Sequence, residues 1–403
     1  MILGKKVVVT GLGSISSLGR DTHGFWRSLI AGKSGISRLR GFSPQDFKTS
    51  VGAQIHDFNP EEYFPAVEIP LLDRYTQFAL VAAREALEDS GLGQAEIRDG
   101  AVVIGTGCGG KETDERSYQA LYKEKKRRLH PLTIPRGMPS SAASQVSMVC
   151  GVTGPVFALS SACASANHAV IQAAILIRSG LVEVAVAGGT DAPFTYGLLK
   201  AWEALRVLSQ DTCRPFSSDR SGLVLGEGAG MVVLESEIHA RRRSAHVYCE
   251  LAGFGMTADA GHITDPSADG AARAMSVALT DAHMNPGEID YINAHGTGTL
   301  ANDVTETRAI RLALGNRAGA VAISSTKSMH GHALGASGAL ELIATILAIQ
   351  HGIVPATMNF TAPGAGCDLD YTPNLPRTMK VQAALSNSFA FGGLNAVVAV
   401  RSC

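Results

Sequence analysis

The sequence predicts an α/β protein built from two similar halves, with sheets covered by helices and two buried helices facing one another at the centre. Strands alternate with helices along most of the chain. A helix–strand unit around Ala86-Leu87 recurs 192 positions later around Ala278-Leu279, and both copies lead into a Gly-Thr-Gly. Two further segments, near 163–180 and 338–352, are apolar nearly all round, which predicts buried helices.

Length and composition exclude several classes of function. The 403 residues are 45% hydrophobic and 18% charged with a net charge of −1, so they can bury one large core or two fused ones. A general nucleic-acid or membrane-surface binder needs a basic excess, which this chain lacks. Seven scattered cysteines show no metal-ligand spacing, which favours reduced thiols, a cytoplasmic location and no metal. We also expect no targeting segment and no membrane span.

The chain opens with an apolar strand over 7–10, which we expect to enter a tight glycine turn at Gly11 and Gly13. A dinucleotide site is disfavoured there, because a third glycine and a following acidic residue are missing.

The later elements follow from periodicity and turn residues. The alternation breaks down between 108 and 150, where residues 123–128 form the strongest charge cluster, either a solvated helix face or a docking patch for an acidic partner. We divide the chain into an N-terminal half, 1–240, and a C-terminal half, 241–403. The expected elements are a helix over 74–90 and strands over 101–104, 182–187 and 231–234.

Cys163 lies in a Ser/Ala-rich turn at the start of the first buried helix. Unpaired backbone N–H groups and the helix dipole at such a position favour a thiolate and can lower a cysteine pKa from about 8.5 to roughly 3.5–7.5. The sequence therefore offers Cys163 as a nucleophile. A small buried apolar residue is the other interpretation.

Three later stretches place polar residues among small ones beside apolar runs. Asn293-Ala-His295-Gly-Thr297 follows a strand, and Lys327-Ser-Met-His330-Gly-His332 precedes the second buried helix. The third, 386–393, is expected to be a turn flanked by strands. Each alone could be structural, but their combination points to a site.

With these motifs, the chain resembles the elongating β-ketoacyl-acyl carrier protein synthases of the thiolase superfamily, from about residue 5 to residue 400. The resemblance implies a thiolase-like duplicated αβαβα layered fold with two mixed sheets around central buried helices. It also implies a catalytic triad of Cys163, His295 and His332, an acyl carrier protein partner, and substrates held on phosphopantetheine with no other cofactor. Finer details, including Gly189-Thr-Asp191-Ala-Pro193, are similar to nodulation-type ketosynthases, which extend specialised unsaturated acyl chains.

The resemblance assigns further roles around the triad. It implies an oxyanion hole made by the backbone amides of Cys163 and Phe391, and a gate made by Phe389 and Phe391. Lys327 with Glu306 would hold the charge balance and orient the histidines.

Substrate contacts are also implied by the resemblance. Thr297 and Thr299 would hydrogen-bond the pantetheine arm, although simple packing of a glycine turn is the alternative for this region. Cys108 stands where relatives often carry a bulkier residue at the acyl pocket, and Met138 would reach that pocket across a homodimer or heterodimer. Ala390 replaces a glycine common in the gating loop, which would stiffen it. Carrier-protein docking is expected at Arg74, Arg127, Arg128 and Arg214.

Three alternatives to an elongating condensing enzyme can be compared with the motifs. A non-catalytic chain-length partner of another ketosynthase typically lacks the nucleophile, whereas Cys163 and both histidines are present. A degradative thiolase needs a second cysteine near 386–393, which contains none. Initiating synthases use Cys-His-Asn, and His332 occupies the third position here. Chain length, unsaturation and obligate pairing with a partner subunit remain open from the sequence.

Overall fold

The computed structural model describes residues 4–403, and its main feature is a sheet of ten strands in the order β10-β9-β13-β14-β8-β1-β7-β6-β4-β5. Its N-terminal five are β1 (Val7–Ser16), β4 (Ala101–Gly105), β5 (Val156–Leu159), β6 (Val184–Asp191) and β7 (Gly228–Ser236). The C-terminal five are β8 (Cys249–Ala258), β9 (Tyr291–Asn293), β10 (Ala322–Ser324), β13 (Ala383–Ala390) and β14 (Leu394–Arg401).

The two predicted mixed sheets are present as five-stranded halves joined at one edge. Each half contains parallel pairs, such as β4 with β5 and β9 with β13, and antiparallel pairs, such as β6 with β7 and β13 with β14. Three residue pairs between β1 and β8 connect the two halves into one continuous sheet.

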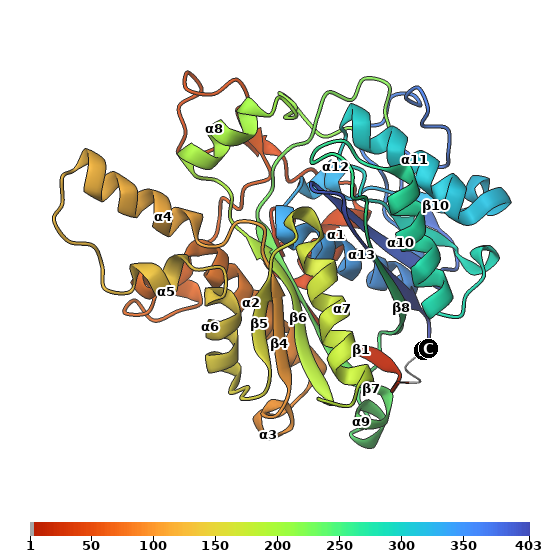
Figure 1. The fold of residues 1–403 in the computed structure, drawn as a ribbon, viewed down its shortest axis with the longest axis horizontal. Coiled ribbons are helices and arrows are strands. Elements are labelled where there is room, and N and C mark those ends of the chain that lie inside the picture. The colour runs from red at the N-terminus through yellow and green to blue at the C-terminus, as the bar shows by residue number, and fades with distance from the viewer. Residues whose placement is uncertain (1–3) are drawn as a thin grey trace.

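Thirteen helices surround and separate the halves within residues 4–403 (Figure 1). The two central ones, α7 (Ser165–Arg178) and α13 (Ser337–His351), contact each other and strands of both halves. The outer layers contain α2 (Arg74–Ser90) and α6 (Ser141–Cys150) on one side, and α10 (Ala268–Asp281) and α11 (Leu300–Leu314) on the other. This arrangement confirms the predicted layers and the two facing buried helices.

The remaining elements are short. The helices are α1 (Thr22–Ile30), α3 (Gln94–Ile97), α4 (Lys111–Tyr118), α5 (Thr133–Gly137), α8 (Tyr196–Ala204), α9 (Glu237–Arg242) and α12 (Lys327–His330). Two small ribbons pair β2 (Ser37–Arg38) with β3 (Val51–Gly52) and β11 (Ile353–Val354) with β12 (Arg377–Thr378). Of the turns of 3-10 helix, η4 (Ala162–Ala164) and η7 (Leu334–Ala336) lead into α7 and α13.

The duplication predicted from the sequence is present. In the first copy α2 and α3 lead into β4, and in the second α10 and a 3-10 turn, η5 (Pro286–Glu288), lead into β9. In both copies the helix lies on the outer face of its sheet half.

The prediction of a glycine turn at Gly11 and Gly13 is wrong. Strand β1 continues through both residues to Ser16, and α2 lies directly against them. A Cβ atom at Gly11 would lie 2.1 Å from the Ala86 carbonyl oxygen, and one at Gly13 would lie 2.0 Å from that of Ala82. These glycines therefore permit close helix–strand packing.

Helix α13 with the preceding turn, Leu334–His351, is long and apolar enough by composition to cross a membrane. However, 89% of this segment is buried inside the fold, as in the core helix of a folded domain.

Candidate active site

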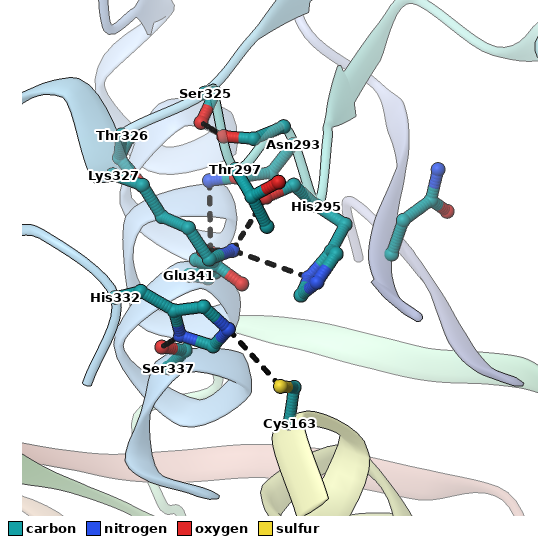
Figure 2. A network of polar contacts seen from close by, with 12 residues as sticks. Cys163, Asn293, His295, Thr297, Ser325, Thr326, Lys327, His332, Ser337 and Glu341 are labelled. Carbon is teal, nitrogen blue, oxygen red and sulfur yellow. Dashed lines mark hydrogen bonds and ion pairs between the residues drawn. The ribbon is translucent and has the colours of Figure 1, made fainter. Parts of the chain in front are cut away.

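The site lies where the two central helices begin. Cys163 sits in η4, directly before α7, while His295 follows β9 and His332 precedes η7 and α13. All three side chains are buried, and one ligand-type atom from each lies within 4.8 Å of the others (Figure 2). The fold therefore brings the three predicted triad residues together from both halves of the chain.

The hydrogen bonds of His332 determine where its proton lies. Its Nε2 is 3.1 Å from Cys163 Sγ. The backbone N–H of Leu334 donates to Nδ1 over 3.1 Å, and Ser337 Oγ lies 2.9 Å from the same nitrogen. Because Nδ1 accepts a backbone N–H, the neutral ring carries its proton on Nε2. His332 is thus a donor toward the sulfur, and Figure 2 shows this contact as a dashed line from the ring to Cys163.

Lys327 fixes His295 in the same way. Its Nζ donates to the His295 carbonyl oxygen over 2.7 Å and lies 3.3 Å from His295 Nδ1. An ammonium has no acceptor, so Nδ1 must be unprotonated and Nε2 carries the hydrogen. The two imidazole rings lie edge to face with centroids 5.4 Å apart. Two Nε2–H donors therefore lie beside the nucleophile candidate.

The carboxylate partner of Lys327 differs from the expected one. Lys327 forms an ion pair with Glu341 of α13, and both side chains are fully buried. Glu306 instead accepts the backbone N–H groups of His295, at 2.8 Å, and Gly296, at 2.7 Å. Glu306 therefore fixes the loop at His295 and Gly296 and is not the ion-pair partner of the Lys327 ammonium. The sequence did carry a signal for this pairing, because Glu341 is a lone carboxylate within the apolar run 339–349 and a buried charge needs a partner.

Burial and the Lys327 charge lower the pKa values of His295 and His332 well below the usual range, so both rings are neutral. The expectation for Cys163 is reversed. Burial raises the pKa of its thiol to about 12, and the Lys327 charge opposes this only in part. The resting site therefore holds a neutral thiol beside two neutral imidazoles, and the His332 Nε2–H stabilises the thiolate as it forms.

A cavity of about 310 Å³ opens beside the triad. Thr297 and Thr299, whose hydroxyl oxygens lie 2.9 Å apart, line it, as do both predicted gate residues, Phe389 and Phe391. Phe389 lies in β13, so the expected turn over 386–393 is confined to residues 391–393. The Phe391 ring stacks on Trp202, with centroids 6.1 Å apart.

A second loop covering this cavity was missed from the sequence. Residues 262–266 line the cavity, and this loop is tied to the gate. The N–H of Gly392 donates to the Ile263 carbonyl over 2.7 Å, and Asn395 Nδ2 donates to Asp259 Oδ1 over 2.7 Å. Arg206, exposed at the same cavity, was also missed. Neither carried a sequence signal, because both depend on distant segments meeting.

The two predicted acyl-pocket residues do not line this cavity. Cys108 is half-buried, and its backbone N–H donates to Asp191 over 3.0 Å. Met138 is 36% exposed, and its carbonyl accepts the Tyr75 hydroxyl over 2.7 Å. Any acyl chain they contact must extend beyond the cavity.

The four predicted docking arginines differ in accessibility. Arg74 is committed to the fold, because its guanidinium donates twice to buried Glu227 and lies over the rings of Phe58 and Phe78. Its side chain is still 26% exposed, so docking at Arg74 stays a prediction in which the guanidinium is already paired.

Arg214 is paired with Asp211 and Asp219 and is largely covered. Arg127 and Arg128 are exposed in the segment after α4 and remain candidates for docking.

One group among residues 4–403 could hold an ion by composition. Cys163, His295 and His332 converge, but their hydrogen bonds place a proton on each Nε2, so these histidines are arranged as donors rather than ligands.

The duplicated fold and the cysteine–histidine site define a condensing acyltransferase. Family models describing the N-terminal and C-terminal domains of β-ketoacyl synthases match residues 4–240 and 248–361. The chain therefore belongs to the β-ketoacyl synthase family, which confirms the predicted relationship.

The similarity to known proteins extends over nearly the full length of the chain. The chain is 49% identical to nodulation protein E of Rhizobium sp. (strain N33), covering 98% of this chain and 99% of that protein. It is 41% identical to 3-oxoacyl-[acyl-carrier-protein] synthase 2 of Coxiella burnetii (strain RSA 493 / Nine Mile phase I), covering 97% of each. A ketosynthase in the AntDE:AntF complex with a type II polyketide acyl-carrier protein superposes with a TM-score of 0.90 at 34% identity, covering 99% of this chain and 100% of that one.

Proposed function

We propose that the chain elongates an acyl chain on acyl carrier protein by decarboxylative Claisen condensation. The observation that carries this is the meeting of one thiol and two imidazole Nε2–H donors beside one cavity. In the first half-reaction, Cys163 Sγ attacks the acyl thioester, and the carrier thiol leaves with the proton that the cysteine gives up. The backbone N–H groups of Cys163 and Phe391 are the proposed oxyanion donors.

In the second half-reaction, a malonyl thioester loses carbon dioxide and becomes an enolate. Its oxygen accepts hydrogen bonds from Nε2–H of His295 and His332, which are neutral because of burial and the Lys327 charge. The enolate carbon attacks the acyl carbonyl on Cys163, and the sulfur leaves as the β-ketoacyl product forms. Glu306 and Lys327 hold His295 in place for this step.

Carrier docking is proposed at the cavity mouth. Thr297 and Thr299 would contact the pantetheine arm, and exposed Arg206 lies where its phosphate would enter. Arg127 and Arg128 offer unburied positive charge to an acidic carrier.

A two-fold dimer completes the proposal. Strand β5 is at the edge of the sheet, and such an edge is a natural pairing surface. Met138 lies among large exposed apolar residues near this edge, so a homodimer, or a heterodimer with a related subunit, would cover them. The exposed residues are Leu129, Leu132, Ile134, Met138, Met148 and Val149.

The proposed substrate is a specialised, unsaturated acyl chain, and the proposed location is the cytoplasm. The 49% identity to nodulation protein E supports the resemblance to nodulation-type ketosynthases, from which this substrate class is inferred. The proposal also keeps the division into halves at residue 240, which the family-model limits support.

Intact-mass spectrometry tests the proposal. The purified protein is incubated with acyl carrier proteins bearing chains of different length and unsaturation, and compared with Cys163→Ala. Cys249→Ala, which removes another buried thiol on β8, is the matched control. We expect an acyl adduct on the wild type and the control but not on Cys163→Ala. A folded wild-type protein that forms no adduct with any chain would contradict the proposal and favour a non-catalytic partner role.

A further inference from the structure

Asp191, at the end of β6, is a buried carboxylate that the proposed reaction does not use. Its side chain accepts four hydrogen bonds, and the donors are N–H and O–H groups rather than cations. Oδ1 accepts from Thr106 Oγ1 at 2.7 Å and from the Cys108 N–H at 3.0 Å. Oδ2 accepts from the N–H groups of Gly107 at 2.8 Å and Gly335 at 2.6 Å. Asp191 is completely buried, so these bonds replace its hydration.

The four donors come from two segments that are far apart in sequence. Residues 106–108 follow β4 in the first half, and Gly335 lies in η7 of the second half, three positions after His332. The segments touch directly, since a Cβ atom at Gly335 would lie 2.5 Å from the Gly107 nitrogen and 2.7 Å from Asp191 Oδ2. The same turn orients His332, because the Leu334 N–H donates to its Nδ1.

From this geometry we infer that Asp191 is a positioning residue whose carboxylate anchors the Cys108 loop and the His332 turn to one another. The inference rests on the proposed function, in which Cys108 contacts the acyl chain and His332 stabilises the enolate. One anchor then serves both half-reactions. An acyl chain that displaces the Cys108 loop would also shift the turn that holds the His332 ring.

Two substitutions separate the two sides of the anchor. Asp191→Ala removes the acceptor from all four donors. Asp191→Asn keeps one side-chain oxygen and replaces the other with an NH₂ group. This NH₂ group can donate to Thr106 Oγ1, because a hydroxyl oxygen also accepts, but it cannot accept the Cys108 N–H. Asn should therefore retain the bonds to Gly107 and Gly335 and release only Cys108.

Hydrogen exchange read by mass spectrometry tests the anchor without any substrate. We expect faster exchange in residues 106–109 for Asp191→Asn, and in both 106–109 and 334–336 for Asp191→Ala. Glu85→Gln is the matched control, because Glu85 on α2 also accepts two backbone N–H groups, those of Ser14 and Thr22, away from the cavity. Unchanged exchange in both segments of Asp191→Ala would overturn the inference.

Kinetics then test the link to catalysis. Misplacing a catalytic group by about 1 Å can cost about 100-fold, so Asp191→Ala should lower kcat for condensation by about that factor. Asp191→Asn should keep kcat within about threefold while weakening discrimination between primer lengths, a split that general destabilisation does not produce. Equal effects of the two variants, or a matching loss in Glu85→Gln, would overturn the inference.

If Asp191→Ala does not fold, Gly335→Ala provides the same test with the carboxylate intact. Its methyl group must push the His332 turn away from Gly107. We expect loss of condensation with retained acylation of Cys163, and wild-type condensation in a folded Gly335→Ala protein would count against the shared anchor. A wild type without any condensation would overturn the proposed function, while the exchange pattern would still report on the anchor.

Discussion

Replacing Lys327 with methionine should lower both the stability of the site and its activity, and replacing Glu341 as well should separate the two effects. The ammonium supplies the ion pair to Glu341 and the contact that keeps His295 Nδ1 unprotonated. Methionine has a similar length but no donor. In Lys327→Met the ring can carry its proton on Nδ1, which leaves Nε2 unable to donate to the enolate.

The magnitudes follow from burial. Breaking a fully buried ion pair by removing one partner costs about 3–5 kcal/mol. For a chain of 403 residues this lowers Tm by about 4–6 °C. Burial already raises the pKa of Glu341 to about 7 despite the nearby Lys327 charge. In Lys327→Met that charge is absent, so the Glu341 carboxyl takes up a proton more readily. A carboxyl group whose pKa is raised in the folded state stabilises the fold below its unfolded-state pKa, and this contribution is lost as pH rises. The destabilisation caused by Lys327→Met should therefore grow with pH.

Loss of one enolate donor should reduce decarboxylation of malonyl-acyl carrier protein about 10²–10³-fold. Acylation of Cys163, measured by intact mass, should fall less, because His332 still donates to the sulfur. The double variant Lys327→Met/Glu341→Leu is the control, since replacing both partners of a buried pair by apolar groups is often neutral. It should recover the melting temperature but not decarboxylation. Wild-type decarboxylation in folded Lys327→Met would refute this account of the His295 tautomer.

Three further changes have defined outcomes. Cys108→Phe should shorten the longest primer accepted in an acyl-carrier assay, and an unchanged chain-length preference would show that Cys108 lies outside the acyl path. Reversing Arg127 and Arg128 to glutamate should raise KM for acyl carrier protein, more so at low salt. Arg242→Glu, an exposed reversal on α9, is its control, and equal KM changes would mean no local docking. Burial raises the pKa of Glu85 to about 7, so its stabilising contribution is present below pH 4.5 and is lost as pH rises toward 7. Melting curves of Glu85→Gln should lack that part of the pH dependence, and parallel wild-type and variant curves would contradict it.

The sequence predicted what depends on local pattern. The helix over 74–90 has the same limits as α2, because a capping Asp73 and Gly91 bracket an apolar stripe. The order Cys163, His295, His332 was readable because each lies in its own short motif. The recurrence at Ala278 predicted the second outer helix, since duplicated units bury the same face.

What the sequence could not predict depends on contacts between distant segments. The partner of Arg74 is Glu227, 153 positions away, so this pairing had no local sign in the sequence. Gly11 was assigned to a turn because glycine favours turns, whereas here it admits the backbone of α2. The raised pKa of the Cys163 thiol depends on its burial in the folded chain, which the helix-dipole argument alone does not contain.

Strand β1 has a consequence for the time course of synthesis. Its partners are β7 and β8, so more than 210 residues must be translated after Ser16 before the first pairing partner exists. At about 5–20 residues per second, the ribosome needs roughly 10–40 s for this length. During that interval the apolar strand and the inward faces of α2 and α7 have no complete sheet to cover them. We therefore expect the nascent chain to depend on chaperones until its second half emerges.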